Sequence, residues 1–181
     1  MLRTTDGVAA PPASQLRSRD VTRTRAILSA TKGAVDGSWA ASEGVRRSMQ
    51  ANRRCDTGPE CALRSELHAR GRRFRKDYRI DLDNLRVQVD VAFPRIRVAV
   101  FVDGCFWHRC PIHASDPKQN AEFWERKLRK NVERDRLVDT ELAAAGWTVV
   151  RCWEHEAAEE AAGRVEVAVD RAVAREWLSC V

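Results

Sequence analysis

Two short runs of alternating apolar residues constrain the fold of this chain more than any other feature. In residues 86–93 and again in residues 96–103, every second position is a branched aliphatic residue or phenylalanine, and Pro94-Arg95 separates the two runs. Alternation with a period of two is typical of strands that bury one face, and a short proline turn favours an antiparallel hairpin between them. We therefore predict a β-hairpin over these residues.

Helical patterns flank this hairpin. Residues 59–70 begin with proline and are followed by glycine, as helices often are. Residues 121–145 form a longer amphipathic pattern that ends at Gly146, and residues 156–175 form another. Residues 147–153 read as a strand, and the order strand, helix, strand favours a right-handed parallel crossover. The predicted fold class is α/β, with a mixed sheet flanked by helices.

Length and composition indicate one domain with an N-terminal tail. The chain has 181 residues, and residues 1–45 show no sustained period and are rich in Ala, Ser, Thr, Gly and Arg. We predict a disordered or loosely ordered tail over residues 1–45 and a single domain over residues 46–181. No apolar run approaches the roughly 20 residues of a membrane span, and no secretory signal is recognisable, so we expect a cytoplasmic, nucleoid-associated monomer without a membrane partner.

The charge and the cysteines narrow the possible functions. Lys and Arg number 32 against 26 Asp and Glu, and the resulting net charge of +6 suits a polyanionic partner such as nucleic acid. Several of the six cysteines lie near histidines, which favours metal binding in a reducing compartment over disulfide formation.

Three potential zinc ligands lie in one loop directly after the second predicted strand: Cys105, Cys110 and His113. A structural zinc ion takes four nitrogen or sulfur ligands, so a fourth must come from elsewhere in the chain. The candidates are His155, just past the last predicted strand, and Cys152, inside it. We favour His155, because a strand end beside the loop is a better geometric choice than a strand interior. The alternative is a metal-free loop with buried thiols.

Two carboxylates lie where the predicted hairpin strands end away from their turn. Asp90 is on the non-valine face of the first strand, and Asp103 ends the second. Together they could bind a hard divalent cation such as Mg²⁺, which uses oxygen ligands, activates water and stabilises phosphoryl charge. For either residue alone, an ordinary polar-face or strand-end position is the simpler explanation.

Asp135 and His108 are candidates for proton transfer. Asp135 shares one stripe of the predicted long helix with mostly apolar residues, and an acid on a core-facing stripe needs a partner. His108 is a natural partner, which Asp135 could orient as a general acid or base; the alternative is a solvated Asp135. Glu60 lies in the first turn of its predicted helix, where the helix dipole favours acids, so spacing alone does not select it.

Adjacent aromatic residues mark the same loop. Phe106 and Trp107 cannot easily both point inward, and exposed rings beside basic residues suggest stacking on DNA bases or wedging between them. Phosphate contacts could come from Lys118, Arg126, Lys127, Arg129 and Lys130. The alternative for these charges is an ordinary solvated helix face.

Several motifs in fixed order resemble the very short patch repair (Vsr) endonucleases. These are residues 104–108, 122–124, 131–135, 146–147 and 153–154. The resemblance extends from about residue 48 to the final helix and implies a restriction-endonuclease-like fold with a structural zinc site. It also implies Mg²⁺-dependent nicking of duplex DNA on the 5′ side of the T in a T:G mismatch, which deamination of 5-methylcytosine leaves behind.

The resemblance also implies roles by motif position. Asp90 and the Val102 carbonyl resemble the family's Mg²⁺ contacts, and His108 with Asp135 resembles its catalytic pair. Glu60 falls on a glutamate of the family's N-terminal helix, which places it in the site. The intercalating rings correspond to Phe106, Trp107 and Trp124, and the zinc ligands fall at or near Cys105, Cys110, His113 and His155.

Asp103 departs from the family, whose best-studied member has a second histidine there. A direct bond from Asp103 to Mg²⁺ would make this an ordinary two-acid nuclease and would put strict mismatch specificity in doubt.

The leading hypothesis is a mismatch-nicking endonuclease of very short patch repair. One alternative is a nuclease of the same fold that serves restriction or phage defence and cuts other lesions or modified DNA. Another is a zinc-dependent DNA-binding module without catalysis, against which Asp90, His108 and Asp135 argue.

Overall fold

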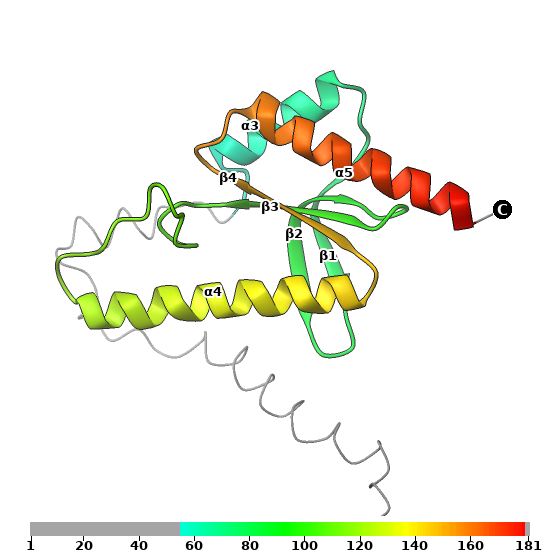
Figure 1. The fold of residues 1–181 in the computed structure, drawn as a ribbon. Helices are drawn as coiled ribbons and strands as arrows, with labels where there is room; N and C mark the ends of the chain where they lie inside the picture. The colour runs from blue at the N-terminus through cyan, green and yellow to red at the C-terminus, as the bar shows by residue number, and fades with distance from the viewer. Residues whose placement is uncertain (1–54, 180–181) are drawn as a thin grey trace, which may run out of the picture. The chain divides into compact units, whose positions relative to one another are not determined.

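A four-stranded mixed sheet forms the centre of the computed structural model, which describes residues 55–179 (Figure 1). Its strands, in spatial order, are β1 (Arg75–Asp81), β2 (Arg86–Phe93), β3 (Val98–Asp103) and β4 (Thr148–Trp153). The pairs β1–β2 and β2–β3 are antiparallel, whereas β3 and β4 are parallel. The predicted tail over residues 1–45 and the predicted domain start at residue 46 lie outside the described residues.

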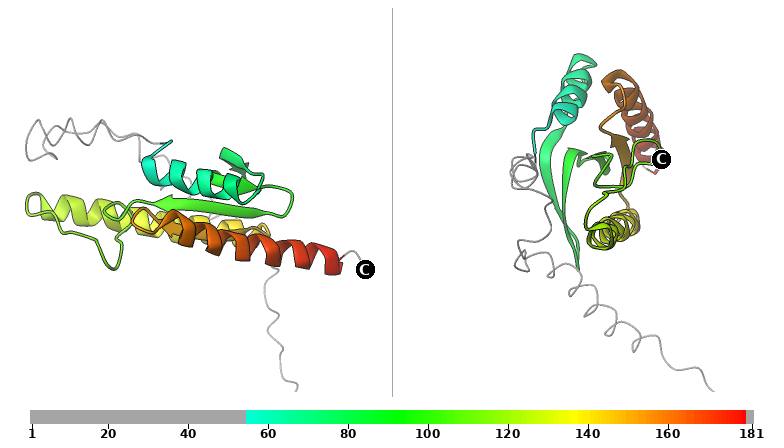
Figure 2. Two further views of the ribbon diagram at one scale, coloured as in Figure 1. Left: turned by 90° about the horizontal axis from the view of Figure 1, so that it is seen from above. Right: turned by 90° about the vertical axis from the view of Figure 1, so that its left-hand side faces the viewer.

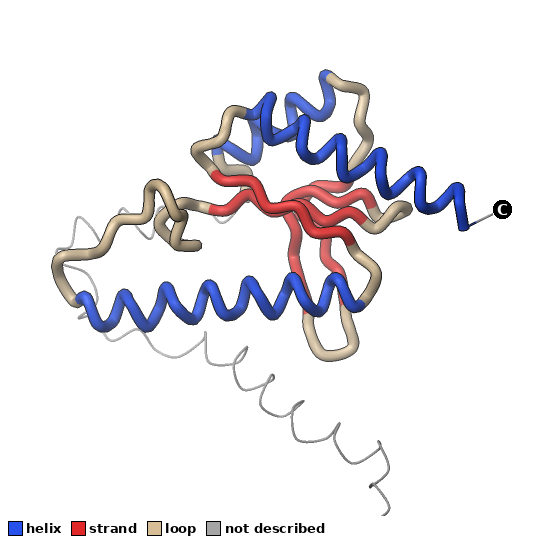
Figure 3. The backbone as a smooth tube through the Cα atoms, in the orientation of Figure 1, coloured by secondary structure: helices blue, strands red, loops and turns tan. Residues whose placement is uncertain are grey.

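Helices cover both faces of this sheet. Two of them, α3 (Gly58–Ala69) and α5 (Ala158–Ser179), lie on one face, and α4 (Ala121–Ala144) lies on the other (Figure 2). Figure 3 shows the same layers by secondary structure, together with the long loop that leads from β3 to the start of α4. Within residues 55–179, no helix combines the length and the apolar character needed to cross a membrane.

The hydrophobic core fills the space between the sheet and the layer of α3 and α5. Its most buried members, each at most 2% exposed, include Val91, Val98, Val100, Leu63, Leu67 and Val165. Because side chains alternate along a strand, the sequence neighbours of these valines point to the opposite face, toward the α4 side. That face carries Asp90 on β2, Asp103 at the end of β3 and Arg151 on β4.

The predicted hairpin is confirmed, with a register that pairs Val91 with Val100. Its second strand begins at Val98 and not at residue 96, because residues 94–97 form the turn and Arg97 has a left-handed φ of 50°. The predicted helices and the parallel strand pair around α4 are also confirmed. Gly146 follows the end of α4 with a φ of 80°, a conformation that glycine adopts without steric cost.

β1 is an edge strand that no sequence pattern predicted. Its seven residues, RKDYRID, carry charges at most positions, so no apolar alternation reveals it. The antiparallel ladder with β2 continues on both sides of Asp77, which itself has a φ of 47° and stands opposite Asp90 in the register. A left-handed conformation in a residue other than glycine costs about 1–3 kcal/mol, so surrounding contacts must hold Asp77 in this form.

Candidate active site

Asp90 lies where β2 and β3 separate. The ladder between them ends at the pair Val91 and Val100, and beyond it the Asp90 carboxylate accepts a 2.7 Å hydrogen bond from the main-chain N–H of Val102. Burial raises the pKa of Asp90 to about 6; the Val102 hydrogen bond opposes this shift, and nearby carboxylates add to it. Those carboxylates belong to Glu60, Asp103 and Asp77. Such a concentration of negative charge suits a divalent cation with oxygen ligands.

Glu60 is fixed at the N-terminus of α3. Its carboxylate accepts 2.8 Å hydrogen bonds from the main-chain N–H of Asp56 and from the hydroxyl of Thr57. This arrangement is a variant of the helix capping box, and the residue is only 5% exposed. Glu60 therefore caps its helix, as its position predicts, and its charge also reaches Asp90.

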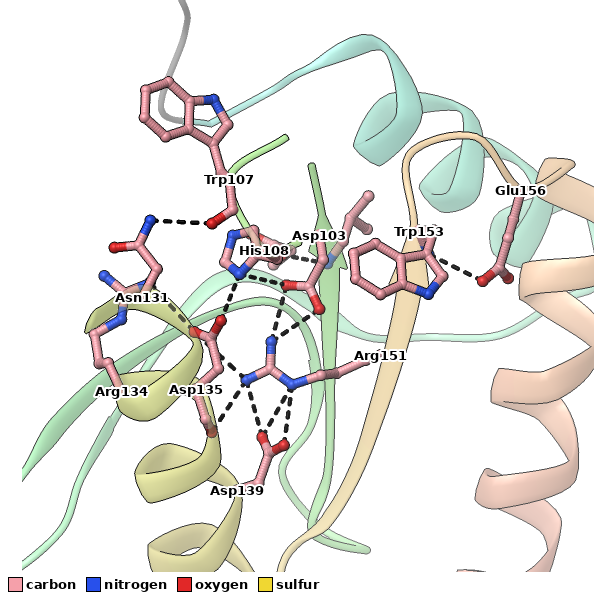
Figure 4. A network of polar contacts seen from close by, with 12 residues as sticks. Asp103, Trp107, His108, Asn131, Arg134, Asp135, Asp139, Arg151, Trp153 and Glu156 are labelled. Carbon is pink, nitrogen blue, oxygen red and sulfur yellow. Dashed lines mark hydrogen bonds and ion pairs between the residues drawn. The ribbon is translucent and has the colours of Figure 1, made fainter. Parts of the chain in front are cut away.

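His108 and Asp135 are in contact, although they come from the loop after β3 and from α4. Nδ1 of His108 lies 2.6 Å from a carboxylate oxygen of Asp135 and 3.6 Å from one of Asp103 (Figure 4). Burial opposes ionisation of Asp135, yet the hydrogen bond and charge of His108 lower its pKa below the usual value. Asn131, one turn earlier on α4, donates a 3.1 Å hydrogen bond to the carbonyl of Trp107 and so ties the loop to the helix.

Arg151 also belongs to this site, although it was not among the residues predicted from the sequence. Its Nη1 donates to both carboxylate oxygens of Asp103, at 2.8 and 2.9 Å. Its Nε and Nη2 donate to Asp139, which lies one helical turn after Asp135. A charged residue inside the apolar run of β4 was the signal that the sequence offered. Asp103 is thus held by an arginine and lies beside His108 (Figure 4).

A second cluster of side chains has the chemistry of a zinc site. The ligand atoms of Cys105, Cys110, His113 and His155 all lie within 4.8 Å of one another. Sγ of Cys105 is 3.0 Å from Nδ1 of His155, and Sγ of Cys110 is 3.8 Å from the same nitrogen. Ligands of a tetrahedral zinc ion lie roughly 3.4–3.8 Å apart, so the donor types match those of a zinc site and the four atoms lie near the spacing that zinc requires.

The other candidate ligand, Cys152, points away from this cluster. It is 1% exposed and packs in the core with α3 and α5. The end of β4 instead approaches the cluster through its next residues: His155 joins it, and Glu154 accepts a 2.6 Å hydrogen bond from the main-chain N–H of Cys105. The start of the cysteine loop is therefore held by two consecutive residues from a distant part of the sequence.

The aromatic residues of the loop pack together with the first turn of α4. The ring centroids of Phe106 and Trp107 lie 5.2 Å apart, and each lies within 6.0 Å of the Trp124 ring. Phe106 and Trp107 are half-buried and Trp124 is 4% exposed, so neighbouring rings cover part of the surface that was expected to be exposed. Nζ of Lys127 lies 5.3 Å from the Trp107 and Trp124 rings. The predicted phosphate contacts Lys118, Arg126, Lys127, Arg129 and Lys130 are all exposed.

Known proteins resemble this chain over most of its length. The type II nicking enzyme V.NaeI of Lentzea aerocolonigenes is 48% identical over 153 residues, which cover 84% of this chain and 89% of that protein. The type II nicking enzyme V.XorIIP of Xanthomonas oryzae pv. oryzae is 42% identical over a region that covers 61% of this chain and 79% of that protein. DNA mismatch endonuclease Vsr of Escherichia coli K12 is 35% identical over a region that covers 60% of this chain and 67% of that protein. Residues 42–113 also match the family described as DNA mismatch endonuclease Vsr.

The sheet with helices on both faces and these relatives define a DNA nicking endonuclease, whose substrate is DNA. The chain belongs to the Vsr endonuclease family. This membership confirms the predicted fold class and enzyme class, and the Cys/His cluster suggests a zinc site of the predicted kind.

Proposed function

We propose that this protein is an Mg²⁺-dependent endonuclease that nicks one strand of duplex DNA in the service of a restriction–modification system. Two relatives named type II nicking enzymes are 48% and 42% identical to the chain, whereas the relative named DNA mismatch endonuclease Vsr is 35% identical. This order supports the restriction-linked alternative more than a general role in very short patch repair.

The proposed substrate is a T:G mismatch at the methylation site of that system. Deamination converts 5-methylcytosine to thymine, so a methylated recognition sequence is where such mismatches would arise, and the nick would fall 5′ of the T. The family description as a mismatch endonuclease supports this substrate. The aromatic cluster beside His108 also supports it, because rings can stack on or wedge between bases that are weakly paired.

Asp90 and the Val102 carbonyl would hold the magnesium ion, and Glu60 would add negative charge beside them. The observation that carries the nuclease chemistry is the place of Asp90, half-buried at the point where β2 and β3 separate and hydrogen-bonded to the Val102 N–H. Burial, and to a smaller extent the charges of Glu60, Asp103 and Asp77, raise its pKa to about 6. Bound there, Mg²⁺ would supply an activated water and stabilise phosphoryl charge.

His108 is the proposed proton-transfer residue. Asp135 engages its Nδ1 at 2.6 Å, which leaves Nε2 to exchange a proton with the attacking water or the leaving oxygen. Asp135 would fix the tautomer and the ring orientation, as carboxylates do beside catalytic histidines. A zinc ion bound by Cys105, Cys110, His113 and His155 would keep the loop that carries His108 folded.

Replacing His108 with Ala should lower the single-turnover nicking rate by roughly 10²–10⁴. The Mg²⁺ concentration for half-maximal rate should change little, because His108 is not a proposed metal ligand. Asp135→Asn should give a smaller loss of the same kind. His68→Ala, which removes an exposed histidine at the end of α3, is the matched control. A rate within twofold of wild type in His108→Ala would remove His108 from the chemistry.

Replacing both Phe106 and Trp107 with Ala should weaken mismatch binding by about tenfold or more, since stacking contributes roughly 1–3 kcal/mol per base. The melting temperature should fall by only a few degrees, because both rings are half-buried and stand outside the core under α3 and α5. Fluorescence anisotropy and thermal melting measure the two effects. Trp177→Ala, which removes a 73% exposed ring on α5, should change neither. Collapse of stability with unchanged affinity would make the rings structural.

The substrate proposal is tested with duplexes of several flanking sequences, each of which carries T:G, T:A, C:G or 5-methylcytosine:G at a single position. The protein is incubated with each duplex and Mg²⁺, and nicks are mapped on both strands. A nick only in T:G, 5′ of the T, is the expected result. A strong preference for one flanking sequence would support the restriction-linked role, and equal cutting in all contexts would favour general repair. Cutting of the methylated duplex would favour the modified-DNA alternative, and binding without cutting would favour a non-catalytic module.

A further inference from the structure

Arg151 connects the carboxylates that surround His108. Its guanidinium donates to both oxygens of Asp103 at 2.8 and 2.9 Å, and Nη2 also lies 3.4 Å from the main-chain carbonyl of Asp135 and 3.8 Å from its carboxylate. Asp103 and Asp135 in turn approach Nδ1 of the same imidazole, at 3.6 and 2.6 Å. Figure 4 shows the guanidinium below both acids and the histidine above them.

The orientation of Arg151 is itself fixed from two sides. Nε and Nη2 donate to Asp139 at 3.1 and 2.9 Å, and the guanidinium carbon lies 4.7 Å from the centroid of the Phe101 ring. The side chain is 23% exposed, and although burial acts against its charge, the hydrogen bonds and charges of Asp139 and Asp103 raise the pKa of Arg151 above its usual value. A planar, permanently charged guanidinium held in this way can fix the orientation of a carboxylate, which a lysine ammonium cannot do.

The pairing also determines what Asp103 can do. Both of its carboxylate oxygens accept hydrogen bonds from Arg151, and the residue is only 4% exposed. Direct ligation of Mg²⁺ by Asp103 would compete with two charge-assisted hydrogen bonds that already fix the carboxylate in a partly buried place. Asp90 is less constrained, since among the described residues its carboxylate accepts one hydrogen bond, from the main-chain N–H of Val102.

We propose that Arg151 is a positioning residue for His108: it holds Asp103 and Asp135 against the imidazole and keeps Asp103 out of the magnesium site. This inference rests on the proposed function, in which His108 transfers the proton and Asp90 binds the metal. Asp103 then acts through the histidine, and the pair of Asp103 and Arg151 forms one unit.

The test compares Arg151→Gln, Asp103→Asn and the double variant in single-turnover nicking of the T:G duplex over a range of Mg²⁺ concentrations. Each single variant should lower the maximal rate about tenfold to a hundredfold and leave DNA affinity and the half-saturating Mg²⁺ concentration within about twofold. The double variant should be no slower than the slower single variant, because residues that act as a unit are not additive. Arg151→Lys should recover only part of the rate. Arg175→Gln, whose arginine contacts Thr148 of the same strand, is the matched control.

A large rise in the Mg²⁺ requirement of Asp103→Asn would overturn the proposal, because Asp103 would then be a metal ligand. Multiplicative rate losses in the double variant, or full activity in Arg151→Gln, would also overturn it. A readout independent of catalysis separates this proposal from the proposed function. Nitrogen NMR of the His108 ring should show that the Nδ1-protonated tautomer, favoured in wild type, loses population in Arg151→Gln. An unchanged tautomer population in Arg151→Gln would reject the positioning role, even if the wild-type protein nicks no duplex. If the wild-type protein nicks no duplex but the tautomer population changes in Arg151→Gln, only the proposed function is rejected.

Discussion

Replacing Asp90 with Asn is expected to abolish nicking at any workable Mg²⁺ concentration and to leave DNA binding intact. The substitution removes the charge that would hold the cation, while the amide oxygen can still accept the hydrogen bond from the Val102 N–H. Single-turnover nicking and a binding assay in the absence of metal measure the two properties. Asp83→Asn, which changes an exposed carboxylate in the β1–β2 loop, is the control and should behave as wild type. Substantial nicking by Asp90→Asn would end the metal-site proposal.

The same variant should be more stable than wild type in metal-free buffer at neutral pH. The folded pKa of Asp90 is about 6, above the unfolded value of about 3.9. The neutral carboxyl therefore contributes stability that is fully present below about pH 4 and is lost as the pH rises through 6. Two pKa units correspond to about 3 kcal/mol, so the gain in melting temperature should amount to several degrees near pH 7.5 and vanish near pH 4. A gain of the same size at both pH values would mean that ionisation of Asp90 is not its cause.

Replacing His155 with Ala should remove zinc and destabilise the protein strongly. Structural zinc contributes about 10–16 kcal/mol in zinc-finger peptides, and here a fraction of that is expected because the core under α3 and α5 forms without metal ligands. We expect a loss of more than ten degrees in melting temperature, together with loss of about one zinc per chain by elemental analysis.

Cys152→Ala is the matched control for this prediction. Cys152 is buried in the core, so its replacement should also lower the melting temperature, by the roughly 1–2 kcal/mol of a small cavity. Zinc content should nevertheless stay at one per chain, because the Cys152 side chain packs away from the Cys/His cluster. Loss of zinc in Cys152→Ala alone would reverse the choice between the two ligands.

The parts of the fold that local patterns specify could be predicted from the sequence. The hairpin was visible because β2 and β3 each bury one face against α3 and α5, and α4 was visible because of its apolar stripe and its glycine stop. β1 was invisible for the opposite reason. Only Ile80 of this edge strand is fully buried, so charges occupy positions that a central strand would give to valine.

The residues of the candidate site could be predicted where they lie close together in the sequence. The cysteine loop and the acid on the stripe of α4 led to His108 and Asp135, which the structure brings to 2.6 Å. Arg151 and Asp139 were missed because their contacts depend on the register of β3 against β4, which pairs Phe101 with Arg151. That register brings together residues 48 positions apart, Asp103 and Arg151, and no local spacing encodes it.

Within residues 55–179, no strand pairs with the outer side of β1, and this has a consequence for how copies of this protein meet. An unpaired strand edge is a template on which a second chain can add a strand, and aggregation often begins in this way. Here the edge carries Arg75, Lys76, Arg79 and Asp81, and the left-handed Asp77 interrupts the straight row of donors and acceptors that an incoming strand would need. At the high concentrations used for crystallisation or NMR, the sheet should therefore not extend past β1, because an incoming strand would meet a row of charged side chains and the left-handed backbone of Asp77.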